Sequence, residues 1–226
     1  MDDPPGATPS PTVPVDSAAL AIRAFAFLFG TPLVLIAAAL PLVLRADDWH
    51  AARLGQYAVG TVALCIVAAL VLLAVRREPL PGMRVWFGRL RLVDLGIAAL
   101  LLAVATAVLW GFGHVAHGPR AWHIPRTGPE VAGWVVLCIA VGVCEEIIYR
   151  GYCLSRLTLA FGNAWVAWLV QAALYGLLHF GFGPVWIGFT TVAGLFFGFI
   201  ALWRKSLWPV VIVHVLVDIL AAFHGQ

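Results

Sequence analysis

The stretch VAGWVVLCIAVGVCEEIIYRGYC, residues 131–153, is apolar or small throughout except for three charged residues, Glu145, Glu146 and Arg150. A helix needs about 20 mainly apolar residues to cross the hydrocarbon core of a bilayer, and this stretch is long enough. A charge at the bilayer centre opposes insertion by about 2.5–3.5 kcal/mol, so such residues normally face a bundle interior and have a function. The stretch therefore predicts a membrane helix with a polar site. A purely structural alternative is that both glutamates reach the membrane surface or pair with arginine.

The composition of the whole chain also favours a membrane location. Hydrophobic residues make up 62% of the 226 residues, charged residues make up 11%, and the mean hydropathy is +0.96. Soluble domains are about 45–50% apolar and about 25% charged, so the sequence predicts an all-α, polytopic transmembrane helix bundle with the lipid bilayer as a partner. The net charge of +3 is explained by basic residues beside the apolar runs, and no nucleic-acid partner is expected. The four cysteines lack CxxC spacing and indicate neither a disulfide framework nor a zinc cluster.

Apolar runs predict about seven spans. We expect them at about 19–44, 54–75, 92–112, 130–153, 163–180, 185–203 and 208–224. The fifth is short, and the sixth allows a tilted or partly re-entrant arrangement. Before the first span, residues 1–18 are rich in proline and small residues and predict a disordered tail.

The remaining chain divides into two parts. Residues 19–128 are expected to form accessory transmembrane helices with a basic loop at about 76–91, whose arginines and aromatics predict a segment on the membrane surface. Residues 129–224 contain the polar motifs and form the expected core. When the loops alternate between two sides, ten of the 14 lysines and arginines fall on one side and four on the other. The positive-inside rule then places the N-terminus in the cytoplasm and the C-terminus outside, and the arginine-rich composition favours a bacterial plasma membrane.

Helical geometry gives the two glutamates different surroundings. Residues four apart share a helix face, so Arg150 lies over Glu146 and can pair with it. Glu145 is rotated by about 100° from Glu146 and by about 140° from Arg150. The spacing therefore predicts a structural pair, Glu146 with Arg150, and leaves Glu145 to face another group.

Two further polar pairs recur at the same spacing on later apolar runs. They are Tyr175 with His179 in ALYGLLHFGFG and His214 with Asp218 in VVIVHVLVDIL. At 1.5 Å per residue, Glu145, His214 and His179 come out at depths of about 16, 13 and 15 Å, which is near the middle of the membrane. We therefore expect a carboxylate and two imidazoles to meet within the bundle.

Two kinds of hydrolytic chemistry suit these groups. In one, Glu145 takes a proton from water with help from His179, while His214 and Asp218 stabilise the oxyanion. In the other, Glu145, His179 and His214 bind zinc and leave a position open for water. The spacing does not decide between them, so zinc is an open alternative and no other cofactor is expected.

The three motifs, taken in order, resemble those of the CPBP family of intramembrane proteases, which includes CAAX proteases and bacteriocin-processing Abi proteins. The resemblance covers residues 130–222 and implies a glutamate-dependent endopeptidase with its site in the membrane. By this resemblance, Glu145, His179, His214 and Asp218 are catalytic, whereas Glu146, Arg150 and Tyr175 are structural or orienting. An aspartate at position 218 departs from the asparagine often found there; since ionised carboxylates cannot donate a hydrogen bond, Asp218 is expected to orient His214 or to be protonated.

The expected substrate is a membrane-associated protein or peptide, either a prenylated CaaX-type sequence or a peptide precursor. Two other functions compete with this one: a non-catalytic membrane immunity or scaffold protein, and a proton-coupled transporter. A transporter would be expected to contain inverted repeats or paired broken helices, and the sequence contains neither.

Overall fold

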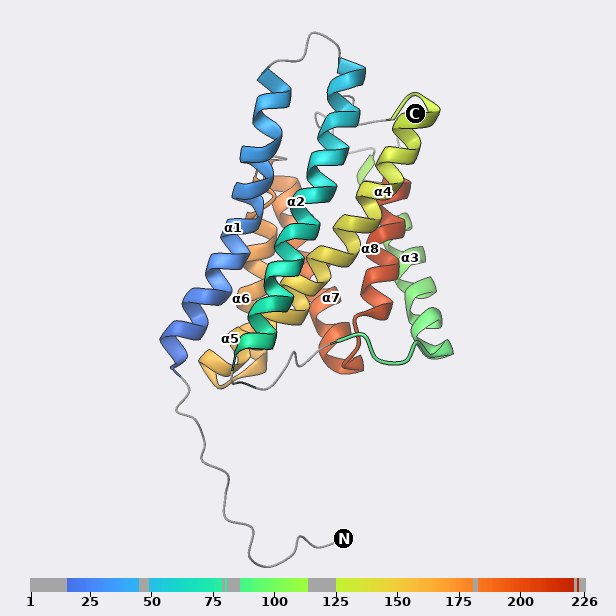
Figure 1. The fold of residues 1–226 in the computed structure, drawn as a ribbon. Helices are drawn as coiled ribbons and strands as arrows, with labels where there is room; N and C mark the ends of the chain where they lie inside the picture. The colour runs from blue at the N-terminus through green and yellow to red at the C-terminus, as the bar shows by residue number, and fades with distance from the viewer. Residues whose placement is uncertain are drawn as a thin grey trace, which may run out of the picture.

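The computed structural model describes residues 16–44, 49–78, 80, 86–113, 125–180, 183–221 and 223. Most of the expected tail, and residues 79 and 81–85 of the expected surface loop, lie outside this part of the chain. Within it, the regular structure is helical apart from one isolated bridge between Trp86 and Ser206. The helices pack side by side with their axes along one general direction (Figure 1). The prediction of an all-α bundle is confirmed.

Four helical segments in the described residues are long and apolar enough to cross a membrane. They are Ser17–Ala38, Arg53–Arg77, Gly128–Phe161 and Pro184–Arg204. Three shorter apolar helical segments accompany them, at Leu92–Val108, Ala164–Leu177 and Trp208–Ala221. Each of the seven lies in or across one of the expected spans, and the whole has the character of a helical membrane bundle.

The first three helices are α1 (Ser17–Leu44), α2 (Trp49–Arg77) and α3 (Leu92–Gly113). In Figure 1, α1 and α2 run side by side, and α3 lies on the other side of the bundle beside α8 (Trp208–Ala221). The carboxylate of Asp94 accepts a hydrogen bond from the backbone N–H of Arg91 at 3.0 Å and so caps the start of α3.

The segment that contains the two glutamates is one continuous helical run with a change of winding. It consists of α4 (Gly128–Glu145), the π-helix η2 (Glu146–Cys153) and α5 (Leu154–Phe161). A capping box of Thr127 and Glu130 starts it, and Gly162, with φ of +65°, ends it. The run therefore continues beyond the expected end at 153, because the π-helical turns pass directly into α5 rather than into a loop.

The last part of the bundle is formed by α6 (Ala164–Leu177), α7 (Pro184–Arg204) and α8. Helix α6 ends before His179, which lies in a turn, so the expected helix at 163–180 is shorter than predicted at its end. Helices α6 and α7 approach closely at Gly176, where an added Cβ would collide with Thr191 and lie 2.8 Å from the carbonyl oxygen of Ile187. This hairpin places Tyr175 and His179 beside η2.

Buried ion pairs fasten helices that are distant in sequence. Glu130 of α4 accepts from Nε of Arg53 of α2 at 3.0 Å. At the other end of α2, Glu78 contacts Nη2 of Arg156 at 2.6 Å and accepts from the hydroxyl of Tyr152 at 2.8 Å. Because the paired side chains are buried, each pair fixes the relative position of two helical segments.

The described part of the basic loop is attached to the turn between α7 and α8. The backbone carbonyl of Trp86 accepts from the N–H of Leu207 at 3.1 Å, and Gly88 accepts from the indole of Trp208 at 2.7 Å. Nη2 of Arg204 lies 3.0 Å from the carboxylate of Asp94. The residues between α2 and α3 therefore hold the start of α8 in place, in addition to any contact with the membrane surface.

Candidate active site

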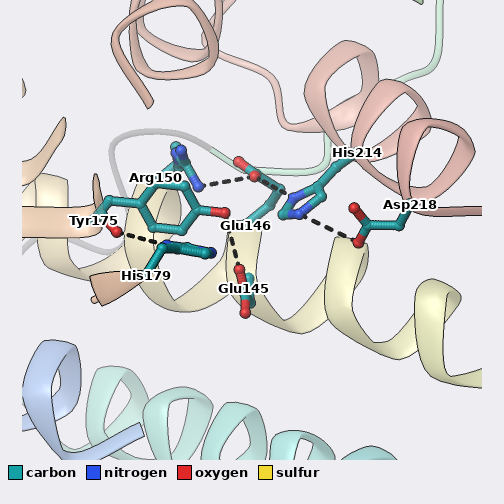
Figure 2. A network of polar contacts seen from close by, with 7 residues as sticks. All are labelled: Glu145, Glu146, Arg150, Tyr175, His179, His214 and Asp218. Atoms are coloured by element: carbon teal, nitrogen blue, oxygen red, sulfur yellow. Dashed lines mark hydrogen bonds and ion pairs between the residues drawn. The ribbon is translucent and has the colours of Figure 1, made fainter. Parts of the chain in front are cut away.

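Three separate helical regions bring the predicted site residues together. The junction of α4 and η2 contributes Glu145, Glu146 and Arg150, the end of α6 contributes Tyr175 and His179, and α8 contributes His214 and Asp218. Figure 2 shows the seven side chains close together, with hydrogen bonds and ion pairs that join them into two groups. All seven had been selected from sequence spacing.

Glu146 is the centre of the first of these groups. Its Oε1 accepts from Nη1 of Arg150 at 2.9 Å and lies 2.9 Å from Nδ1 of His214. The side chains of Glu146 and Arg150 are completely buried. The predicted i,i+4 pair is present, and the same oxygen also joins η2 to α8, a contact that the spacing did not predict.

His214 lies between two carboxylates. Its Nδ1 faces Glu146, and its Nε2 lies 3.6 Å from Oδ2 of Asp218, which is too long for a strong hydrogen bond. Ionised carboxylates only accept, so both ring nitrogens are placed to carry protons. With His214 as an imidazolium, the two positive charges of Arg150 and His214 balance the two negative charges of Glu146 and Asp218.

Glu145 belongs to the second group. Its Oε2 accepts from the hydroxyl of Tyr175 at 3.1 Å. Nδ1 of His179 lies 2.9 Å from the backbone carbonyl oxygen of Tyr175, and since a carbonyl only accepts, this nitrogen carries the proton. Tyr175 thus orients Glu145 through its hydroxyl. Its backbone carbonyl fixes the tautomer of His179.

Aromatic contacts fix the ring of Tyr175. The guanidinium carbon of Arg150 lies 4.2 Å from the ring centre, and the rings of Tyr149 and His179 are edge-on to it at 5.2 and 4.9 Å. A cation over an aromatic face is attractive, by about 2 kcal/mol when the pair is desolvated. The ring therefore separates Arg150 from Glu145 while connecting the two halves of the site.

The zinc alternative does not fit this arrangement. Within the described residues, no three His, Cys, Asp or Glu side chains form a group that could hold a metal ion. In Figure 2, Glu145 lies beside Tyr175 and His179, whereas His214 faces Glu146 and Asp218. Both ring nitrogens of His214 face carboxylates, so this side chain is not directed at a common position with Glu145 and His179.

A comparison with family models identifies the part of the chain that contains this site. Residues 126–220 match the family described as type II CAAX prenyl endopeptidase Rce1-like. This segment is therefore similar to Rce1-like endopeptidases. The match confirms the resemblance drawn from the three motifs. Searches of curated proteins and of solved structures each found no match.

The Rce1-like segment begins just before α4 and ends within α8, so it contains all seven site residues. Helices α1, α2 and α3 lie outside the match. Members of this family are membrane-embedded endopeptidases of CAAX type, which matches the location of the polar network within an apolar helical bundle.

Gln171 is one of the buried polar residues that the sequence motifs did not indicate. It is completely buried on α6, one turn before Tyr175 and two turns before His179. Its spacing of four from Tyr175 was visible in the sequence, but an uncharged side chain in an apolar run gives a weaker signal than a glutamate.

Proposed function

We propose that this Rce1-like protein is an intramembrane endopeptidase in which Glu145 activates the hydrolytic water. The observation that supports the proposal most directly is the hydrogen bond of 3.1 Å from Tyr175 to one oxygen of Glu145. This bond occupies Oε2 and orients the carboxylate, so that Oε1 is the oxygen assigned to water. Orienting a general base in this way is a usual requirement of acid–base catalysis.

In the proposed reaction, Oε1 of Glu145 takes a proton from water while the water oxygen attacks the carbonyl carbon of the scissile peptide. The carbonyl oxygen becomes an oxyanion. When this intermediate collapses, the C–N bond breaks and the proton passes to the leaving amine. His179, with its proton on Nδ1, presents Nε2 as an acceptor that orients the same water.

His214 supplies positive charge for the oxyanion. Nδ1 of His214 is held by Glu146, whereas the contact of Nε2 with Asp218 is long at 3.6 Å, so this N–H is the one assigned to the oxyanion. A preorganised donor of this kind contributes about 2.7–4 kcal/mol in well-studied enzymes. Asp218 and Glu146 keep the imidazolium charged and oriented.

The proposed substrate is a membrane-associated chain with a C-terminal CaaX-type sequence that carries a prenyl group. The family match supports this choice, and a peptide precursor without a lipid is the second candidate. We place the enzyme in a bacterial plasma membrane with its N-terminus in the cytoplasm, in agreement with the distribution of basic residues.

The test uses the purified protein in liposomes with two peptides that differ only in a farnesyl group on the CaaX cysteine. We expect cleavage by the wild type and by Asp16→Asn, which makes the same carboxylate-to-amide change outside the site. Glu145→Gln, His179→Ala and His214→Ala should each abolish cleavage. If cleavage survives in all three, the proposed site is wrong, and a preference for the unmodified peptide would exclude the prenyl substrate.

Metal analysis of the same preparations tests the discarded alternative. A stoichiometric metal that is lost in His179→Ala together with activity would restore the zinc site. Protein that binds a substrate peptide but cleaves none of a membrane-protein library would instead favour the scaffold function.

A further inference from the structure

Buried polar side chains on η2 and on α6 lie near the contact between α6 and α7. The side chains of Glu146, Arg150 and Gln171 are completely buried. In the part of the chain that the structure describes, five of their atoms have no hydrogen-bond partner: Oε2 of Glu146, Nε and Nη2 of Arg150, and both polar atoms of the Gln171 amide. An unsatisfied buried group costs about 1–3 kcal/mol, and hydrocarbon offers no replacement partner.

Arg150 and Gln171 approach the same region, the contact between α6 and α7. Gln171 precedes Tyr175 by one turn, so their side chains share a face of α6. The guanidinium carbon of Arg150 lies 4.2 Å from the ring centre of Tyr175 and 5.7 Å from that of Phe197. Next to Phe197 is Gly198, where an added Cβ would lie 3.6 Å from Oε1 of Gln171.

The chemistry of these atoms indicates their partner. Helices α6 and α7 pack closely here, since an added Cβ at Gly198 would lie 2.8 Å from Trp168. The five atoms comprise three donors and two acceptors, a mixture that water can satisfy because it both donates and accepts. An anion would meet the carboxylate of Glu146, and a cation would meet Arg150.

We propose that Glu146, Arg150 and Gln171 hold ordered water between η2, α6 and α7, and that this site supplies the water hydrolysed at Glu145. The supply role rests on the proposed function; the presence of water does not. Tyr175 connects the two places, since its ring contacts Arg150 and its hydroxyl contacts Glu145. A hydrolase surrounded by hydrocarbon consumes water, which the hydrocarbon does not supply. Water held on the other side of the Tyr175 ring replaces each molecule that is consumed.

The first test detects the water without using activity. Ionising radiation converts bound water to hydroxyl radical, which labels adjacent aromatic rings even when bulk solvent does not reach them. We expect Tyr175 and Phe197 to be labelled in the wild type, and the labelling to be lost in Gln171→Leu and Gln171→Met. Gln56→Leu, the matched change on α2, should leave the labelling of both rings unchanged. A wild type in which neither ring is labelled would overturn the proposal.

Thermal unfolding gives a second measure of the same site. If the site held no water, Gln171→Leu would remove two unsatisfied polar atoms together with the desolvation cost of each. The Tm would then rise by several degrees. With water bound, the Tm should stay unchanged or fall, because the amide is already satisfied. A marked rise in Tm would therefore contradict the proposal.

Kinetics test the supply role. Gln171→Leu should lower kcat about tenfold, equivalent to about 1.4 kcal/mol, and leave KM unchanged, whereas Gln56→Leu should change neither. Loss of labelling with unchanged kcat would make the water structural and exclude the supply role. If Glu145→Gln still cleaves, the proposed function fails, and the labelling result continues to decide whether the site holds water.

Discussion

At the scale of single residues, the two adjacent glutamates face different neighbours. Oε1 of Glu146 is shared by Arg150 and His214, both at 2.9 Å, so this carboxylate compensates two buried cations. Glu145 accepts from Tyr175 and remains only partly buried. Stability should therefore depend on the first carboxylate, and the proposed chemistry on the second.

Glu146→Gln should destabilise the protein, whereas Glu145→Gln should leave a folded but inactive one. Removing one partner of a buried ion pair costs about 3–5 kcal/mol, because the remaining charge is left without compensation. Thermal unfolding in detergent and peptidase activity, measured on the same preparations, separate the two effects. An equal loss of stability in both variants would contradict the division of roles.

Tyr175→Phe should lower kcat by about 10- to 100-fold with little change in KM, since a hydrogen bond to a charged group contributes about 1.5–3 kcal/mol. The aromatic ring and its contact with Arg150 are retained, so the Tm should change little. Tyr57→Phe on α2 is the matched control. A rise in KM at constant kcat would show that the hydroxyl serves substrate binding and not Glu145.

Contacts within one helix were predictable from the sequence, and contacts between helices were not. The pairing of Arg150 with Glu146 was predictable because a spacing of four fixes their relative position on a helix. The bond from Glu146 to His214 joins residues 68 positions apart, and it depends on how α8 packs against η2. No periodicity contains that information.

At the scale of elements, close approach of α6 and α7 decides where Tyr175 and His179 lie. Gly176 lies against the carbonyl oxygen of Ile187 and the side chain of Thr191 on α7. The apolar runs were sufficient to predict these helices, because about 20 apolar residues have few other stable arrangements in a bilayer. The π-helical winding of η2 was not predicted, because it changes the pattern of backbone hydrogen bonds and leaves the composition unchanged.

Gly176→Ala should separate α6 from α7 and lower stability by about 1–3 kcal/mol, the usual cost of overpacking. Gly188→Ala on α7 is the control, because an added Cβ there meets nothing within 4 Å. Activity should fall further than stability in Gly176→Ala, since Tyr175 is the adjacent residue. Equal Tm values for the two variants would show that the helices adjust without strain.

At the scale of the whole molecule, ion pairs at the ends of helices hold α2 and α3 to the Rce1-like segment. Arg53 with Glu130, and Arg204 with Asp94, join the two parts at 3.0 Å each. The sequence predicted that the basic residues lie beside the apolar runs, but not which carboxylates they would meet. These two accessory helices are therefore fastened to the core and do not simply surround it.

The proposed orientation, with the N-terminus in the cytoplasm, rests on the basic residues, of which ten of 14 fall on the side of the N-terminus. A tag at the N-terminus should be protected from protease added to intact cells and digested in inverted membrane vesicles. A C-terminal tag should behave in the opposite way. Identical behaviour of the two tags would mean that the number of spans is even.

The position of His214 on α8 has a consequence for biosynthesis. The proposed site needs a carboxylate from residue 145 and an imidazole from residue 214, and the Glu146 that stabilises this imidazole precedes it by 68 residues. A nascent chain that has inserted every helix but α8 therefore contains no complete site. Under the proposed mechanism, peptidase activity should therefore arise only after α8 has joined the bundle, and chains that lack α8 should not cleave their neighbours in the membrane.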